Sequence, residues 1–101
     1  MVTPNPFSSG SAKWNVLAAY GSQRRLGKSD KQAIAYVENL FGHVVSQDTS
    51  GRNATNTFLA GKGDVLLTYE SEAITSRLYG QDIQYVIPRQ SMLIELPIAV
   101  L

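Results

Sequence analysis

The sequence predicts an α/β domain with a mainly parallel sheet, and three observations carry this prediction. Apolar stripes with helical spacing alternate along the chain with short apolar runs typical of strands. A glycine stands at or just beyond the end of each stripe of helical type. The 101 residues, of which 44% are hydrophobic and 17% charged, suffice for one domain with a buried core. Such alternation is typical of parallel sheets covered by helices.

The first helix is expected from about Ala12 to Arg25. Trp14 and Leu17 are spaced to share one face of it, and Gly27 is a stop signal. Aromatic residues at helical spacing usually belong to the core. On this basis the aromatic residues expected to be buried are Trp14, Phe41 and Phe58.

The turn ahead of this helix is a candidate anion site. Two prolines stiffen its approach, and Ser9, Gly10 and Ser11 follow. Small side chains let a ligand approach the main chain, and the unpaired amides of a first helical turn carry partial positive charge. Phosphate and sulfate bind at such positions. An ordinary serine N-cap is the alternative interpretation of the same pattern.

A second helix is marked more firmly, by a capping box. Ser29 is followed three residues later by Gln32, and the apolar stripe after them ends at Gly42. A short strand is expected next, over residues 43–47.

The second half of the chain alternates over shorter distances. A polar turn at 48–53 leads into a short helix expected over 54–60. Residues 64–69 form the strongest strand pattern in the sequence and run directly into a helix expected over 70–78. Two further strands are expected over 83–87 and within the apolar segment 92–101, where Pro97 argues against a central position in the sheet.

Three junctions where a helix begins are expected to converge. Ligands of parallel α/β sheets gather at the carboxyl ends of the strands, where the chain passes into helices. Two of these junctions offer small residues with exposed amides, and the third offers a phenol. The residues predicted to bind an anion there are Ser9, Gly10, Ser11, Gly51 and Tyr69.

Nucleotide and nucleic acid are disfavoured as ligands. The segment 21–29 resembles a phosphate-binding P-loop, but it has five residues between its glycines where the motif has four, and it follows a helix instead of a strand. A formal charge of +1 and a pI near 8.0 indicate no general affinity for polyanions.

Enzyme, metal and cofactor readings find little support. The chain has no cysteine and one histidine, His43, so a metal site would depend on carboxylates. A triad of Ser9, His43 and Asp48 is conceivable by residue type, but no serine lies in a Gly-x-Ser-x-Gly turn. We therefore expect a binding protein with no catalytic residue, no metal and no cofactor.

These motifs together resemble the sulfate- and thiosulfate-binding proteins of bacterial ABC transporters, and specifically their central lobe. Residues 3–6 and 9–20 are similar to the Thr-Pro-Asn-Pro, Ser-Gly-Gly-Ala-Arg-Trp-Asn and Leu-Ala-Ala-Trp runs of that family. Residues 48–58 are similar to its Asp-Ser-Gly-Ala-Arg-Gly-Ala-Thr-Thr-Thr-Phe segment. Residues 63–73 are similar to its Gly-Asp-Val-Leu, aromatic, Glu-Asn-Glu-Ala signature. The ends of the match are 85–88 and 94–100.

The resemblance implies a fold and a set of ligands. The fold is one lobe of a type 2 periplasmic binding protein, a three-layer sandwich. The family holds dehydrated sulfate with neutral donors, so Ser9 would supply a hydroxyl and Gly10, Ser11 and Gly51 would supply amides. Tyr69 stands where the family has a tryptophan, and Ser11 replaces its second glycine. The ligand is sulfate, thiosulfate or a related tetrahedral oxyanion such as molybdate.

The resemblance also implies partners and a location. The family works outside the cytoplasm with a second lobe and a transporter permease, whereas residues 1–101 resemble a single lobe without a signal peptide. We therefore expect an excised or truncated lobe in which 92–101 resembles the strand that returns to the other lobe. That segment could instead pair two copies of the chain. A free-standing interaction domain that has lost the ligand is the alternative function.

Overall fold

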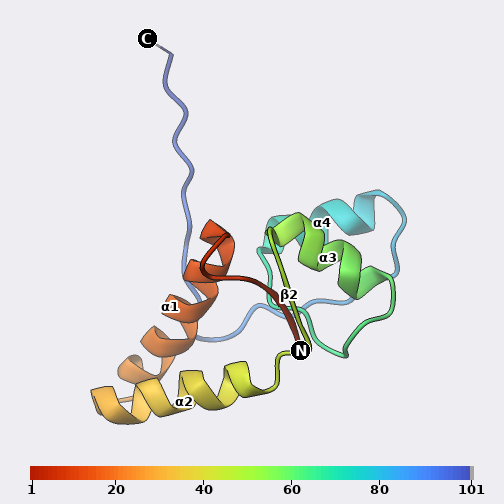
Figure 1. Ribbon diagram of the computed structural model, residues 1–101. Helices are drawn as coiled ribbons and strands as arrows, with labels where there is room; N and C mark the ends of the chain where they lie inside the picture. The colour runs from red at the N-terminus through yellow and green to blue at the C-terminus, as the bar shows by residue number, and fades with distance from the viewer. Residues whose placement is uncertain (101) are drawn as a thin grey trace.

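The computed structural model describes residues 1–100 and has four helices and two short strands in that range (Figure 1). Along the chain these are β1 (Val2–Pro4), α1 (Gly10–Arg25), α2 (Asp30–Gly42), β2 (Ser46–Asp48), α3 (Gly51–Leu59) and α4 (Glu70–Leu78). The four predicted helices and the α/β class are confirmed. No helix within residues 1–100 has the length and apolar character to cross a membrane.

The sheet is parallel and is centred on the first residues of the chain. β1 pairs with β2 in the register Val2 with Ser46, Thr3 with Gln47 and Pro4 with Asp48. On the other edge of β1, the Val2 amide donates to the Val65 carbonyl at 2.7 Å and the Leu67 amide donates to the Val2 carbonyl at 3.0 Å. β1 therefore lies between two neighbours, which the sequence did not predict because the strand is short and ends in proline.

Several predicted strands differ from the structure. The strand expected over 43–47 lies at Ser46–Asp48, and the pattern at 64–69 makes one isolated bridge, between Leu66 and Val2. Residues 83–87 and 92–100 form no strand, and Leu101 lies outside the described residues. An extended apolar segment becomes a strand only beside a partner that pairs with its backbone groups. Neither segment has such a partner within residues 1–100.

Each helix buries one alanine against the rest of the domain. The four are Ala12, Ala33, Ala54 and Ala73, each at most 3% exposed. A methyl side chain allows close approach of the helix to its neighbours. The aromatic residues predicted to lie in the core are less covered, because Trp14 is 36% exposed and Phe41 and Phe58 are half-buried. Figure 1 shows α1 and α2 together on one side of the short sheet and α3 and α4 on the other.

Candidate anion-binding site

The first turns of α1 and α3 meet at the end of the sheet where β1 and β2 finish (Figure 1). The loops that follow the two strands are joined by hydrogen bonds. The Asn5 amide donates to the Asp48 carbonyl at 2.7 Å, and the Ser8 hydroxyl donates to the Thr49 carbonyl at 3.2 Å. The α4 first turn lies beside that of α3. The structure thus brings together the three helix starts that were expected from the sequence to converge.

The N-terminus of α1 is open. Ser9 is the N-cap, with an extended backbone (φ −126°, ψ 127°), but its side chain makes no cap hydrogen bond. The Ser9 hydroxyl instead lies 2.8 Å from that of Ser11, and Ser9 is 7% exposed. Within residues 1–100, the amides of Gly10, Ser11 and Ala12 have no hydrogen-bond partner. These three donors are free to bind an anion.

The N-terminus of α3 is partly closed. Its N-cap, Ser50, accepts a hydrogen bond from the Asn53 amide at 3.1 Å, while the amides of Gly51 and Arg52 have no partner among residues 1–100. Gly51 lies against α1, because a Cβ built on it would stand 2.9 Å from the Ser11 hydroxyl oxygen. Ser9, Ser11 and Gly51 therefore belong to one small region.

Tyr69 lies at the start of the neighbouring helix. It is the N-cap of α4, its side chain makes no cap hydrogen bond, and its carbonyl accepts from the Glu72 amide at 3.1 Å. Within residues 1–100, its hydroxyl has no hydrogen bond to Ser9, Ser11 or any other residue. Its place near the other junctions comes from the packing of α3 against α4.

An ion pair joins α3 to α4 at these first turns. The Arg52 Nε and Glu72 Oε2 atoms lie 3.0 Å apart, and the side chains are 54% and 17% exposed, respectively. The pair lacks hydrogen-bond geometry, and the Glu72 oxygen is buried. Arg52 thereby offsets a carboxylate that would otherwise repel an anion at this end of the sheet. The sequence hypothesis did not include this pair, although the acidic first turn of α4 and the adjacent arginine were visible signals.

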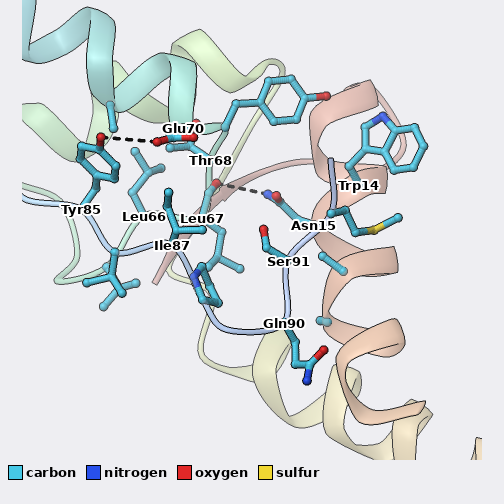
Figure 2. Close-up of a pocket in the computed structure, with 18 of the residues that line it drawn as sticks. Trp14, Asn15, Leu66, Leu67, Thr68, Glu70, Tyr85, Ile87, Gln90 and Ser91 are labelled. Atoms are coloured by element: carbon cyan, nitrogen blue, oxygen red, sulfur yellow. Dashed lines mark hydrogen bonds between the residues drawn. The ribbon is translucent and has the colours of Figure 1, made fainter. Parts of the chain in front are cut away.

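Asn15 fixes α1 to the sheet. Its side-chain amide donates to the Thr3 hydroxyl at 3.1 Å and to the Leu67 carbonyl at 3.2 Å, the second of which is drawn in Figure 2. Asn15 lies one turn after Ser11, so these bonds set where the open end of α1 points. Sequence reasoning missed this role, and a polar residue on the inner face of a helix is the signal that could have found it.

A groove of about 1050 Å³ runs beside the candidate site (Figure 2). Figure 2 shows Trp14 and Asn15 on one side of it, and Tyr85 and Ile87 on the other. Tyr69 is the one predicted anion ligand among its lining residues, so the groove and the open helix ends are separate features. Within residues 1–100, no cluster of three potential metal ligands occurs.

Comparison with known proteins confirms the resemblance seen in the sequence. The chain is 37% identical over 100 residues to the sulfate-binding protein of Synechococcus elongatus and 40% identical over 104 residues to that of Salmonella typhimurium. It is 39% identical over 103 residues to the thiosulfate-binding protein of Pseudomonas aeruginosa. No family model and no solved structure matches the chain.

These alignments cover 99% of the chain but only a part of each relative. The chain spans 29% of the Synechococcus protein, 32% of the Salmonella protein and 31% of the Pseudomonas protein. It is therefore homologous to about one third of a sulfate- or thiosulfate-binding protein. The aligned third contains the open first turn of α1.

Proposed function

We propose that the chain is part of a sulfate-binding solute-binding protein and forms one side of a site for sulfate or a related tetrahedral oxyanion. The observation that carries this proposal is the open N-terminus of α1, where the N-cap Ser9 leaves the amides of Gly10, Ser11 and Ala12 without partners. Three unpaired amides beside a buried hydroxyl are the donors that an oxyanion needs. The similarity to sulfate- and thiosulfate-binding proteins favours sulfate or thiosulfate as that oxyanion.

Each residue has a proposed role. Ser9 donates its hydroxyl, Gly10 and Ser11 donate the amides of α1, and Gly51 donates the amide at the start of α3. Tyr69 donates its phenol directly or through a water. All of these donors are neutral, so the positive ends of the helices supply the attraction.

The donor set also suggests which oxyanions bind. None of the five residues contributes a carboxylate or carbonyl that would accept a proton from the ligand. A fully ionised oxyanion can accept from every donor in such a site, whereas the proton of a hydrogen phosphate could bond only to a hydroxyl oxygen, whose own proton would then turn away from the ligand. Sulfate should therefore bind more tightly than hydrogen phosphate at neutral pH.

The wider setting extends the proposal beyond the chain. The whole protein is a two-lobed receptor of an ABC transporter, located outside the cytoplasm, which binds its ligand without catalysis. The chain is one lobe of a type 2 periplasmic binding protein whose three-layer sandwich is completed in the full-length protein. A partner lobe supplies the remaining donors. Residues 92–101 are the segment that returns to it.

Half of a two-sided site binds weakly. Losing about 4 kcal/mol of contacts lowers affinity roughly a thousandfold, so we expect a millimolar or poorer dissociation constant for the isolated chain. An amide NMR titration with sodium sulfate, matched in ionic strength with sodium chloride, measures this constant. Saturable shifts should concentrate on Gly10, Ser11 and Gly51. A micromolar constant contradicts the half-site proposal, and the absence of saturable shifts contradicts sulfate binding itself.

A second function is a free-standing interaction domain that has lost the ligand. Its support is the exposed apolar segment 92–100, where Leu93 is 87% exposed, Ile98 95% and Val100 98%. Such a segment pairs readily with a second copy of the chain. Light scattering should then report a dimer that forms whether or not sulfate is present. A monomer at high protein concentration rejects this second function.

A further inference from the structure

We infer that the Ser11 hydroxyl is a positioning group that turns the Ser9 hydroxyl toward the anion, and that this role is the reason residue 51 is glycine. The inference rests on the proposed function and assigns the Ser11 side chain a task separate from that of its amide. It is carried by three observations: the contact between the two hydroxyls, the absence of a cap at Ser9, and the space in front of Gly51.

The two hydroxyls form an isolated pair. Their oxygen atoms lie 2.8 Å apart, and the Ser11 hydroxyl is the sole partner of the Ser9 hydroxyl within residues 1–100. Water competes weakly for this contact, because Ser9 is only 7% exposed. Each hydroxyl has one proton, so a pair that uses one proton internally keeps one for an outside acceptor. When Ser11 donates to Ser9, the remaining Ser9 proton is polarised and becomes a stronger donor.

Without Ser11, the Ser9 hydroxyl has another use. Ser29 and Ser50 are also N-caps with extended backbones, and both accept a hydrogen bond from the amide three residues later. Ser9 has the same type of backbone conformation and does not do so. If its hydroxyl capped α1 in this way, it would occupy the Ala12 amide and point away from the anion. Ser11 holds it out of that position.

Gly51 gives the Ser11 hydroxyl its space. A Cβ at residue 51 would stand 2.9 Å from the Ser11 oxygen and 3.6 Å from its Cβ. The backbone of Gly51 does not itself require glycine, because the glycines with positive φ are Gly27, Gly61, Gly63 and Gly80. Glycine is therefore needed at this position because a larger side chain would lack space. A methyl group there would push the Ser11 hydroxyl away from Ser9.

A double-mutant cycle on the full chain tests the inference, using amide NMR titration with sodium sulfate against a chloride control. Ser11→Ala and Ser9→Ala should each weaken sulfate binding by about five- to tenfold, which is the effect of one hydrogen bond. The double variant should bind about as weakly as Ser9→Ala alone, because the two hydroxyls act as a unit. Ser22→Ala removes a hydroxyl near the other end of α1 that bonds to the Ala19 carbonyl, and should leave the affinity unchanged.

Stability separates positioning from a structural role. Ser11→Ala frees Ser9 to cap α1, so its melting temperature should equal or exceed that of the wild type. A melting temperature that falls along with sulfate affinity overturns the inference. So does an unchanged affinity in Ser11→Ala, or additive losses in the double variant, when the wild type binds sulfate. A wild-type chain without saturable shifts rejects the proposed function and this inference together.

Discussion

Helices α1 and α2 both begin after a serine, and the two serines use their hydroxyls differently. Ser29 forms a complete capping box with Gln32, in which each side chain bonds to the other residue's backbone amide. Ser9 caps nothing and pairs with the hydroxyl of Ser11. The residue three positions after Ser9 is Ala12, whose methyl side chain cannot accept a hydrogen bond from the Ser9 amide. One helix end is thereby closed and the other is open.

The difference shows that an N-cap residue does not by itself decide what a helix end can do. The residues in the first turn decide whether the hydroxyl is directed back to the helix or away from it. α3 lies between the two cases, since Ser50 binds the Asn53 amide but the Gly51 and Arg52 amides have no partner in residues 1–100. The following changes would erase or sharpen this contrast.

The largest effect is expected from placing a negative charge at the open end. Gly10→Asp should abolish saturable sulfate shifts, because a carboxylate there would repel the anion and compete for the same amides. Nothing lies within 4 Å of a Cβ at this position, so the side chain fits. Stability should be unchanged or rise by about 0.5 kcal/mol. Gly10→Asn is the uncharged control, and equal sulfate binding by the two variants would contradict the prediction.

A methyl group at Gly51 should weaken sulfate binding by about tenfold, because it displaces the Ser11 hydroxyl and costs about one hydrogen bond. Gly21→Ala is the matched control in open space on α1. It should leave the sulfate affinity unchanged and raise the free energy of unfolding by about 0.5–1 kcal/mol. Amide titration and chemical denaturation measure the two effects. Similar sulfate affinities in both variants would exclude a role for the space at Gly51.

Removing the closed cap should affect stability without affecting binding. Ser29→Ala loses the capping box and should lower the free energy of unfolding by about 1 kcal/mol, with sulfate affinity unchanged. Ser9→Ala should weaken sulfate binding and leave the free energy of unfolding unchanged, because the Ser9 hydroxyl makes no cap bond. Chemical denaturation and sulfate titration of both variants measure these opposite effects on stability and on binding. A larger loss of stability in Ser9→Ala than in Ser29→Ala would show that Ser9 is a structural cap.

The smallest effect is expected at the contact between α1 and the closed end of α2, and only at high pH. The Tyr20 phenol donates a hydrogen bond to Asp30, which raises the pKa of Tyr20 above its ordinary value of 10.0. The neutral phenol is thus favoured in the folded state. Its stabilisation is complete below pH 10 and is lost as the pH rises through the raised pKa.

Melting curves of Tyr20→Phe and the wild type measure this contribution. The difference in melting temperature between them should shrink as the pH passes above 10. Tyr36→Phe is the control, since the Tyr36 hydroxyl has no hydrogen bond to residues 1–100. A difference for Tyr20→Phe that stays constant with pH would contradict the prediction.

The helices could be predicted from the sequence because their ends are encoded locally. The helix Glu70–Leu78 has the predicted bounds, and the capping box at Ser29 forms as predicted. Strands depend on a neighbour, which local pattern does not supply. The three residues of β1 pair with β2 and Val2 also pairs on the other edge, whereas the more apolar segment 92–100 pairs with nothing in the described chain.

The candidate site could be predicted only in part. The order of the motifs placed Ser9, Ser11 and Gly51 in one region, and the structure has them there. The hydroxyl pair could not be predicted, because rotation of a serine side chain depends on its surroundings. The exposure of Trp14 could not be predicted either, because its spacing in the sequence is that of a core residue.

The position of β1 has a consequence for the order in which the domain assembles during synthesis. Val2 is fully buried, pairs in register with Ser46, and is hydrogen-bonded to Val65 and Leu67, all of which the ribosome adds much later than β1. The α1–α2 pair can form from local contacts before then, whereas β1 gains β2 as a neighbour only at residues 46–48 and its second neighbour only when the chain reaches Leu67. Closing contacts of such long sequence separation is slow. Within this domain β1 is therefore synthesised before the other elements, and its pairing is completed only after α3 has been made.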